Sequence, residues 1–113
     1  MTITYQRLAA VRPANTNEQD LYVLTGELIS GMIHVCNQDS TARTYRIAVT
    51  DAGTGVAADG EDFIRYDIEL LSNIMHRVRV EGLNGTATIR IKASIADLIS
   101  FVFFGAIKTW EYF

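Results

Sequence analysis

Residues 74–93 read IMHRVRVEGLNGTATIRIKA, and this stretch decides the fold class. One set of mostly apolar side chains recurs at every second position on either side of Asn84-Gly85: Ile74, His76, Val78, Val80, Ala87, Ile89, Ile91 and Ala93. Such alternation is typical of antiparallel strands that bury one face and leave the other in water. Because Asn-Gly between two alternating runs favours a type I′ turn, the stretch predicts a β-hairpin.

The same two-residue period continues through most of the chain. Alternating runs cover residues 44–49 and 64–70, whereas residues 28–36 are apolar on both faces and predict a central, fully covered strand. A tight turn near Asp97 is expected to precede a final strand. No stretch has the pattern of a long amphipathic helix. We therefore predict an all-β fold, an antiparallel, jelly-roll-like β-sandwich of about eight strands in a single domain.

The two ends of the chain differ from its middle. We expect residues 1–20 to form an N-terminal arm or strand and a loop, residues 21–107 the sandwich core, and residues 108–113 an aromatic tail. The tail holds three large aromatic side chains: Trp110, Tyr112 and Phe113. Aromatic residues at a chain end either fold back onto their own domain or dock on another subunit, and the sequence leaves both open.

Composition narrows the function classes. The chain has 113 residues, enough for one domain with its own core, and 49% of them are hydrophobic, which excludes general disorder. A net charge of −3 argues against a nucleic-acid partner. We expect no membrane span, because no run of about 18 apolar residues occurs, and no signal peptide at the start. The single cysteine, Cys36, excludes a disulfide within the chain.

Few residues offer chemistry. His76 lies on an apolar strand face without a marked partner, so we expect a packed histidine held by one hydrogen bond rather than a general base. His34 and Cys36 lie two residues apart on one strand face and are two possible zinc ligands, but two further ligands are not evident. No phosphate loop or nucleophile elbow occurs. We therefore expect no enzyme activity, no cofactor and no metal.

Two sets of charged residues have alternative interpretations. Acidic residues between 51 and 62 form a solvated loop or, as the less favoured alternative, a calcium site; they are Asp51, Asp59, Glu61 and Asp62. Basic residues on the two runs around Asn84-Gly85 would form a basic strip if the runs pair; they are Arg77, Arg79, Arg90 and Lys92. Such a strip is an ordinary wet sheet face or a patch for an acidic protein partner.

Three parts of the chain resemble small β-sandwich virion proteins of tailed bacteriophages. They are residues 35–49 (VCNQDSTARTYRIAV), residues 62–70 (DFIRYDIEL), and residues 85–94 with 96–105 (GTATIRIKAS and ADLISFVFFG). The resemblance implies a virion structural protein, first a capsid decoration or cement protein and alternatively a tail, baseplate or fibre-associated adaptor. It also implies localisation in the virion after synthesis in the bacterial host cytoplasm. The implied partners are the major capsid protein, other virion proteins and further copies of the chain.

Terminal segments are the expected contact sites of such a building block. The interface candidates are Tyr5, Arg7, Trp110, Tyr112 and Phe113. A hypothesis from another class is a carbohydrate-binding jelly roll, in which exposed aromatic side chains stack on sugar rings. The candidates for that stacking are Tyr22, Tyr66 and Trp110.

Overall fold

The computed structural model of the chain describes residues 2–51, 55–83 and 87–109. These residues form eight strands and one short 3-10 turn, which confirms the predicted all-β class. The elements are β1 (Thr2–Val11), β2 (Gln19–Val23), β3 (Glu27–Asn37), β4 (Arg43–Thr50), η1 (Gly60–Asp62), β5 (Phe63–Leu70), β6 (Met75–Leu83), β7 (Thr88–Ala93) and β8 (Ile99–Thr109).

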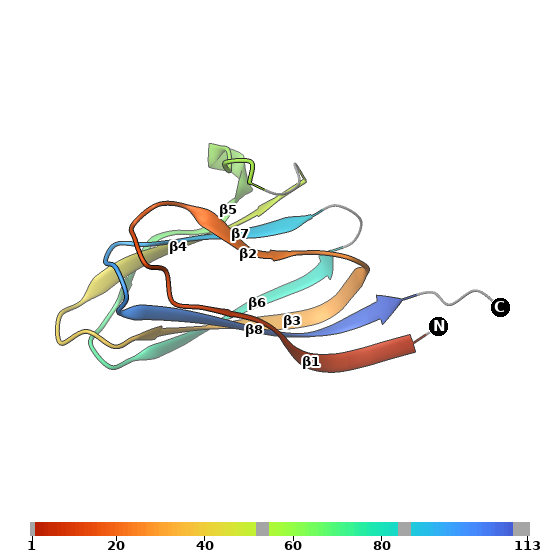
Figure 1. The fold of residues 1–113 in the computed structure, drawn as a ribbon, viewed down its shortest axis with the longest axis horizontal. Coiled ribbons are helices and arrows are strands. Elements are labelled where there is room, and N and C mark those ends of the chain that lie inside the picture. The colour runs from red at the N-terminus through yellow and green to blue at the C-terminus, as the bar shows by residue number, and fades with distance from the viewer. Residues whose placement is uncertain (1, 52–54, 84–86, 110–113) are drawn as a thin grey trace.

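The strands pair as two four-stranded antiparallel sheets, in the orders β1-β8-β3-β6 and β2-β7-β4-β5. Pairing joins β1 to β8, β2 to β7, β3 to β6 and β4 to β5, as in one long antiparallel ribbon rolled around a core. This arrangement is a jelly roll and confirms the predicted sandwich. In Figure 1 the first sheet lies below the second, and η1 lies above the second.

The core lies between the inner faces of the two sheets. Phe101 and Phe103 of β8 are fully buried, as are Ile33 of β3 and Ile89 of β7. Each buried side chain of this size stabilises the folded state by about 2 kcal/mol. The two-residue period therefore identifies the inward-facing positions of β7 and β8 correctly. It fails in β5, where Ile64 and Tyr66 lie on the expected apolar face but are exposed.

The predicted hairpin over residues 74–93 is wrong. Strand β6 pairs with β3, whereas β7 pairs with β2 and β4 in the other sheet. The turn residues Asn84 and Gly85 themselves lie outside the described residues. A hairpin would place both apolar faces side by side in one sheet, while two separate sheets let the faces pack against each other across the core. Long-range packing thus overrides the local turn signal.

Strand β3 is central, as predicted, because it lies between β8 and β6. The prediction that both of its faces are covered is wrong. Ile33 and Val35 are fully buried, whereas Met32, His34 and Cys36 on the other face are only half-buried. A two-layer sandwich covers each sheet on one side only, so the second apolar face of β3 remains on the surface.

The turn before the last strand lies where the sequence predicts it. Asp97 adopts a left-handed backbone with φ of 62°, a conformation that aspartate tolerates better than most residues, and β8 begins at Ile99. The amide of Asp97 donates a hydrogen bond of 2.8 Å to the carbonyl of Pro13. This bond ties the turn to the segment that connects β1 and β2.

The turn between β3 and β4 is built around one buried side chain. Asn37 is fully buried, and its Nδ2 donates to the carbonyls of Thr41 (3.0 Å) and Leu70 (2.9 Å). Its Oδ1 accepts from the amide of Asp39 (2.8 Å), and Asp39 accepts from Arg43 Nε (2.6 Å). The hydrogen bond from Arg43 lowers the pKa of Asp39. Asn37, Asp39 and Arg43 of the segment 35–49 therefore build this turn.

Candidate functional site

The side of the β1-β8-β3-β6 sheet that faces away from the core carries apolar side chains in its middle. The strand register places Phe104 between Met32 of β3 and Arg7 of β1, and it places Val102 beside His34. Phe104, Met32, Val102 and His34 are all half-buried. We call this surface the outer apolar face, and it comprises Met32, His34, Cys36, Met75, Val102 and Phe104. No other described strand packs over it (Figure 1).

Arginines border the outer apolar face on both sides. Arg7 lies on the edge strand β1, and the exposed Arg77 and Arg79 lie on the opposite edge strand β6. A hollow of about 240 Å³ opens between Tyr5, Met32 and Arg79. The surface thus combines an apolar centre with an arginine-rich rim that also holds Glu81, and arginine and apolar side chains are enriched at protein interfaces.

The two side chains that suggested a metal site lie on this same face. The ring of His34 is tilted against that of Phe104, with centroids 5.2 Å apart, and Cys36 is a half-buried free thiol. Within the described part of the chain, no group of three histidine, cysteine, aspartate or glutamate side chains is placed to hold a metal ion. His34 and Cys36 are here components of the outer apolar face.

The outer side of the β2-β7-β4-β5 sheet is polar, and its central arginine is paired within the chain. Arg90 of β7 has only 7% of its side chain exposed and donates to Glu18 (2.8 Å) and Asp20. Burial alone would lower the pKa of Arg90, but the hydrogen bonds to Asp20 and Glu18 outweigh it and raise this pKa. Arg90 therefore stays charged inside a protein-made pocket.

The same two carboxylates hold the segment between β4 and β5 over the sheet. Asp20 accepts from the amide of Gly55 (2.9 Å), and Glu18 accepts from the amide of Ala58 (2.9 Å). Figure 1 shows η1 and its flanking chain lying on this side of the sheet. We call this surface the covered polar face, and it comprises Thr44, Arg46, Asp67, Thr88, Arg90 and Lys92.

The acidic residues of this segment, considered above as a calcium site, have another use. The amide of Asp59 donates to the Asp62 carboxylate (2.8 Å), and the amide of Asp62 donates to the Asp59 carbonyl (3.0 Å). Asp59 and Asp62 thereby stabilise η1. The described geometry supplies a structural role for them.

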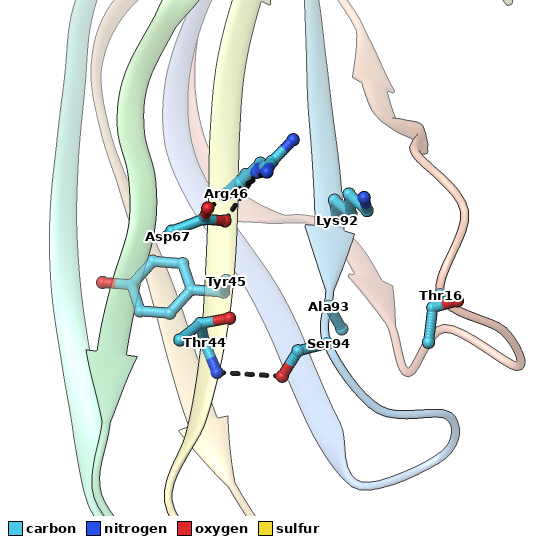
Figure 2. Close-up of a pocket in the computed structure, with 8 residues that line it drawn as sticks. All are labelled: Thr16, Thr44, Tyr45, Arg46, Asp67, Lys92, Ala93 and Ser94. Carbon is cyan, nitrogen blue, oxygen red and sulfur yellow. Dashed lines mark hydrogen bonds and ion pairs between the residues drawn. The ribbon is translucent and has the colours of Figure 1, made fainter.

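A second hollow, of about 250 Å³, opens on the covered polar face (Figure 2). Its lining consists of Thr16, Thr44, Tyr45, Arg46, Asp67, Lys92, Ala93 and Ser94. Arg46 and Asp67 form a two-bond ion pair, with Nε–Oδ1 at 2.6 Å and Nη2–Oδ2 at 3.1 Å. The guanidinium carbon of Arg46 lies 3.9 Å from the ring centroid of Tyr66, which is 53% exposed. Charged, hydroxyl and aromatic groups therefore meet at one place.

The backbone at Asp67 is shaped to make this ion pair. Asp67 has φ of 48°, in the left-handed region, and the pairing of β4 with β5 is irregular between Tyr45 and Ile47. The hydrogen bond from Arg46 lowers the pKa of the Asp67 carboxyl. A non-glycine residue in this conformation stores strain, which the two hydrogen bonds to Arg46 offset.

His76 is a packed histidine, as predicted. Its Nδ1 lies 2.9 Å from the hydroxyl of Tyr45, and the two rings meet edge to face with centroids 5.8 Å apart. Burial of Tyr45 raises the pKa of its hydroxyl. The hydrogen bond between Tyr45 and His76 joins the two sheets near the edge of the core.

The structure separates the predicted interface residues into two groups. Tyr5 is 66% exposed and Arg7 is exposed, and both lie on β1 beside the outer apolar face. The other candidates, Trp110, Tyr112 and Phe113, lie outside the described residues.

The aromatic residues proposed to bind sugars also differ in placement. Tyr22 packs edge-on against Phe103, with centroids 5.6 Å apart, so it is a half-buried residue that packs against the core. Tyr66 is exposed on the covered polar face, and Trp110 lies outside the described residues. Only Tyr66 remains as a described stacking candidate.

The predicted basic strip does not form. Arg77 and Arg79 lie on the outer apolar face, whereas Arg90 and Lys92 lie on the opposite side of the sandwich. The four residues would adjoin only if β6 and β7 paired, and these strands belong to different sheets.

Sequence reasoning missed the apolar centre of the first face, although the signal was present. Residues 28–36 and 99–107 are apolar on both strand faces, and a two-layer sandwich covers only one of them. Met32, Val102 and Phe104 are the surplus apolar side chains in these runs.

Comparison with known proteins gives no match to a protein-family model, a curated protein or a solved structure. Among the described residues, no helix is long and apolar enough to cross a membrane.

Proposed function

We propose that this protein is a structural component of a bacteriophage virion, first of all a capsid decoration or cement protein that stabilises the head through contacts between subunits. The outer apolar face carries this proposal. Residues Met32 and His34 of β3 and Phe104 of β8 lie half-buried on a sheet face over which no described strand packs. Phenylalanine, methionine and arginine are enriched at protein interfaces, and this face combines all three.

Two further observations support the proposal. Three parts of the sequence resemble small β-sandwich virion proteins, and the fold is a jelly roll, an architecture found in viral capsid domains and in lectins. Fold alone does not determine function. The two histidines, His34 and His76, pack against Phe104 and Tyr45, which is a structural use, and we propose a role without catalysis.

The proposed mechanism is mechanical. A stable protein interface buries about 1,200–2,000 Å² in total, and the outer apolar face with its rim would supply one side of such a contact. Arg7, Arg77 and Arg79 favour a partner surface with acidic residues around an apolar centre. Burying the face against a neighbouring capsid subunit would add contact energy at the junction and oppose outward pressure on the shell.

Copy number tests the virion role. We expect quantitative mass spectrometry of purified phage particles to find this chain in numbers comparable to the major capsid protein. A copy number that is a small fraction of the capsid protein would overturn the decoration role in favour of the tail, baseplate or fibre alternative. Absence from purified particles would contradict any virion role.

The hollow on the covered polar face favours a second candidate, a carbohydrate-binding module. Arg46, Asp67 and Lys92 supply polar groups around the hollow, and the exposed ring of Tyr66 lies next to Arg46 (Figure 2 shows the lining). Planar polar side chains beside an aromatic ring suit the hydroxyls and the apolar face of a sugar.

A glycan array followed by titration calorimetry tests this candidate. We expect any glycan bound by the wild-type chain to lose its affinity in Tyr66→Ala. Tyr5→Ala is the matched control, because Tyr5 is also an exposed tyrosine but lies on the other side of the sandwich. A flat response of the wild-type chain on the array excludes the glycan role for the sugars tested.

A further inference from the structure

The four edge strands of the two sheets differ in how they are protected against pairing with another chain. Unprotected edges present free backbone N–H and C=O groups, and natural proteins block them with charges, bulges or short strands. Strand β6 carries Arg77, Arg79 and Glu81 in alternation. Strand β5 carries Arg65 and Asp67 and pairs irregularly with β4. Both edges are therefore blocked.

The edge strand β2 is also blocked. It has only five residues, its register with β7 shifts after Asp20, and Asp20 binds both Arg90 and the amide of Gly55. Contacts within the chain thus already engage Asp20 on this edge strand.

Strand β1 is the exception. Its residues 2–6 read TITYQ, carry no charge and pair regularly with β8, and the register shift comes only after Arg7. Ile3 is 55% exposed and Tyr5 is 66% exposed. No described strand pairs with the free side of β1. A regular, uncharged and partly apolar edge is the kind that accepts a further strand.

We propose that the free edge of β1 pairs antiparallel with β1 of a second copy of this chain, with Thr4 opposite Thr4 at the two-fold axis. Two four-stranded sheets then join into one continuous eight-stranded sheet. The proposal concerns self-association and does not depend on the virion role.

The self-complementarity of the segment favours a second copy over a foreign strand. In this register Ile3 of each copy lies opposite Tyr5 of the other copy, so the two-fold axis generates this pair twice. Aromatic residues opposite β-branched residues, and threonine opposite threonine, are among the favourable cross-strand pairs. The first charge after Thr4, that of Arg7, lies beyond the uncharged segment, so no like charges meet within it.

Sedimentation velocity of the full chain over about 1–100 μM tests the pairing. We expect a monomer–dimer equilibrium for the wild-type chain and a monomer for Thr4→Lys, because two lysines would then lie directly opposite each other. Thr16→Lys is the matched control, since it adds the same charge at an exposed loop position. A monomeric wild-type chain, a dimeric Thr4→Lys or a monomeric Thr16→Lys overturns the proposal.

Cross-linking tests the register. In a Cys36→Ser background, Thr4→Cys should form a disulfide-linked dimer on mild oxidation, because directly opposed antiparallel residues have Cα atoms about 4.5–5.5 Å apart. Gln6→Cys is the control: its two copies would lie four residues out of register, about 13 Å apart along the strand. Cross-linking through Gln6→Cys but not through Thr4→Cys contradicts the proposed two-fold axis, as does a chain that cross-links at neither position.

Discussion

The two outer faces of the sandwich belong to sheets of equal strand number, yet the chain treats them differently. On the covered polar face, Arg90 is enclosed and paired with Glu18 and Asp20, and a loop lies over the sheet. On the outer apolar face, Phe104 is half-buried and Arg79 has no ion pair within the described residues. The difference teaches that the chain covers and pairs the charges of one face by itself and leaves the apolar side chains of the other face half-exposed. The proposed function assigns a neighbouring subunit to the second face.

The same substitution on each face should show the difference between the two faces most clearly. We expect Arg90→Met to reduce the free energy of unfolding by about 3 kcal/mol, because it leaves the carboxylates of Glu18 and Asp20 enclosed without their cation. Arg79→Met, on the exposed rim, should change it by less than about 0.5 kcal/mol. Urea unfolding measures both values.

Equal losses of unfolding free energy in Arg90→Met and Arg79→Met would show that the ion pairs of Arg90 do not stabilise the fold. A second readout comes from limited proteolysis between β4 and β5. Cleavage there should accelerate in Arg90→Met, because Gly55 and Ala58 bond to the same carboxylates that Arg90 orients.

Two phenylalanines give a smaller, complementary contrast. Phe104 on the outer apolar face and Phe63 on the other sheet are both half-buried, so replacement of either by serine should cost about 1 kcal/mol of stability. Only Phe104→Ser should also weaken attachment to the partner, by about tenfold, because a central aromatic side chain contributes strongly to an interface. Binding of purified protein to decoration-free particles measures the attachment.

Attachment that weakens equally in Phe63→Ser would mean that the effect is not specific to the outer apolar face. Unchanged attachment in Phe104→Ser would remove the outer apolar face as the contact.

The smallest expected effect is an acid sensitivity of the sheet that contains Arg46. The pKa of Asp67 is lowered by its hydrogen bond from Arg46, so its contribution to stability is complete above the unfolded-state pKa, about 3.9, and is lost as the pH falls through the lower folded-state pKa. Thermal unfolding between about pH 5 and pH 2 should therefore depend less on pH in Asp67→Asn than in the wild-type chain.

Glu69→Gln is the control for the acid experiment, because Glu69 lies on the same strand and has no ion pair within the described residues. A pH dependence reduced as strongly in Glu69→Gln as in Asp67→Asn would assign the effect to general charge.

The sequence predicted what is local and repetitive. Alternation identified Ile89 and Ile91 as inward-facing, and the turn near Asp97 was found because turn residues interrupt an apolar run. It failed where partners are distant. By alternation Arg90 belongs to a wet face, but Glu18, seventy-two residues away, encloses it. The Asn84-Gly85 signal describes a turn but carries no information about which strand lies across the core.

The candidate site was predictable only in part. Tyr5 and Arg7 were selected as terminal contact residues, and they do border the outer apolar face. The centre of that face was missed because apolar residues on both sides of a strand favour full burial. A count of layers resolves this: two layers cannot cover both sides of Met32 and Ile33.

The pairing of β1 with β8 has a mechanical consequence. Thr2 and Thr109 are register partners, so both ends of the described chain leave the sandwich at the same end of one sheet (Figure 1). A force that separates these two ends would peel β1 from β8 one backbone hydrogen bond at a time, which is the weakest loading direction for antiparallel strands. A force applied along the strands from opposite ends would instead load many of these bonds together. A protein pulled through its two chain ends would therefore unfold at low force, whereas one held through its sheet faces would resist a higher force.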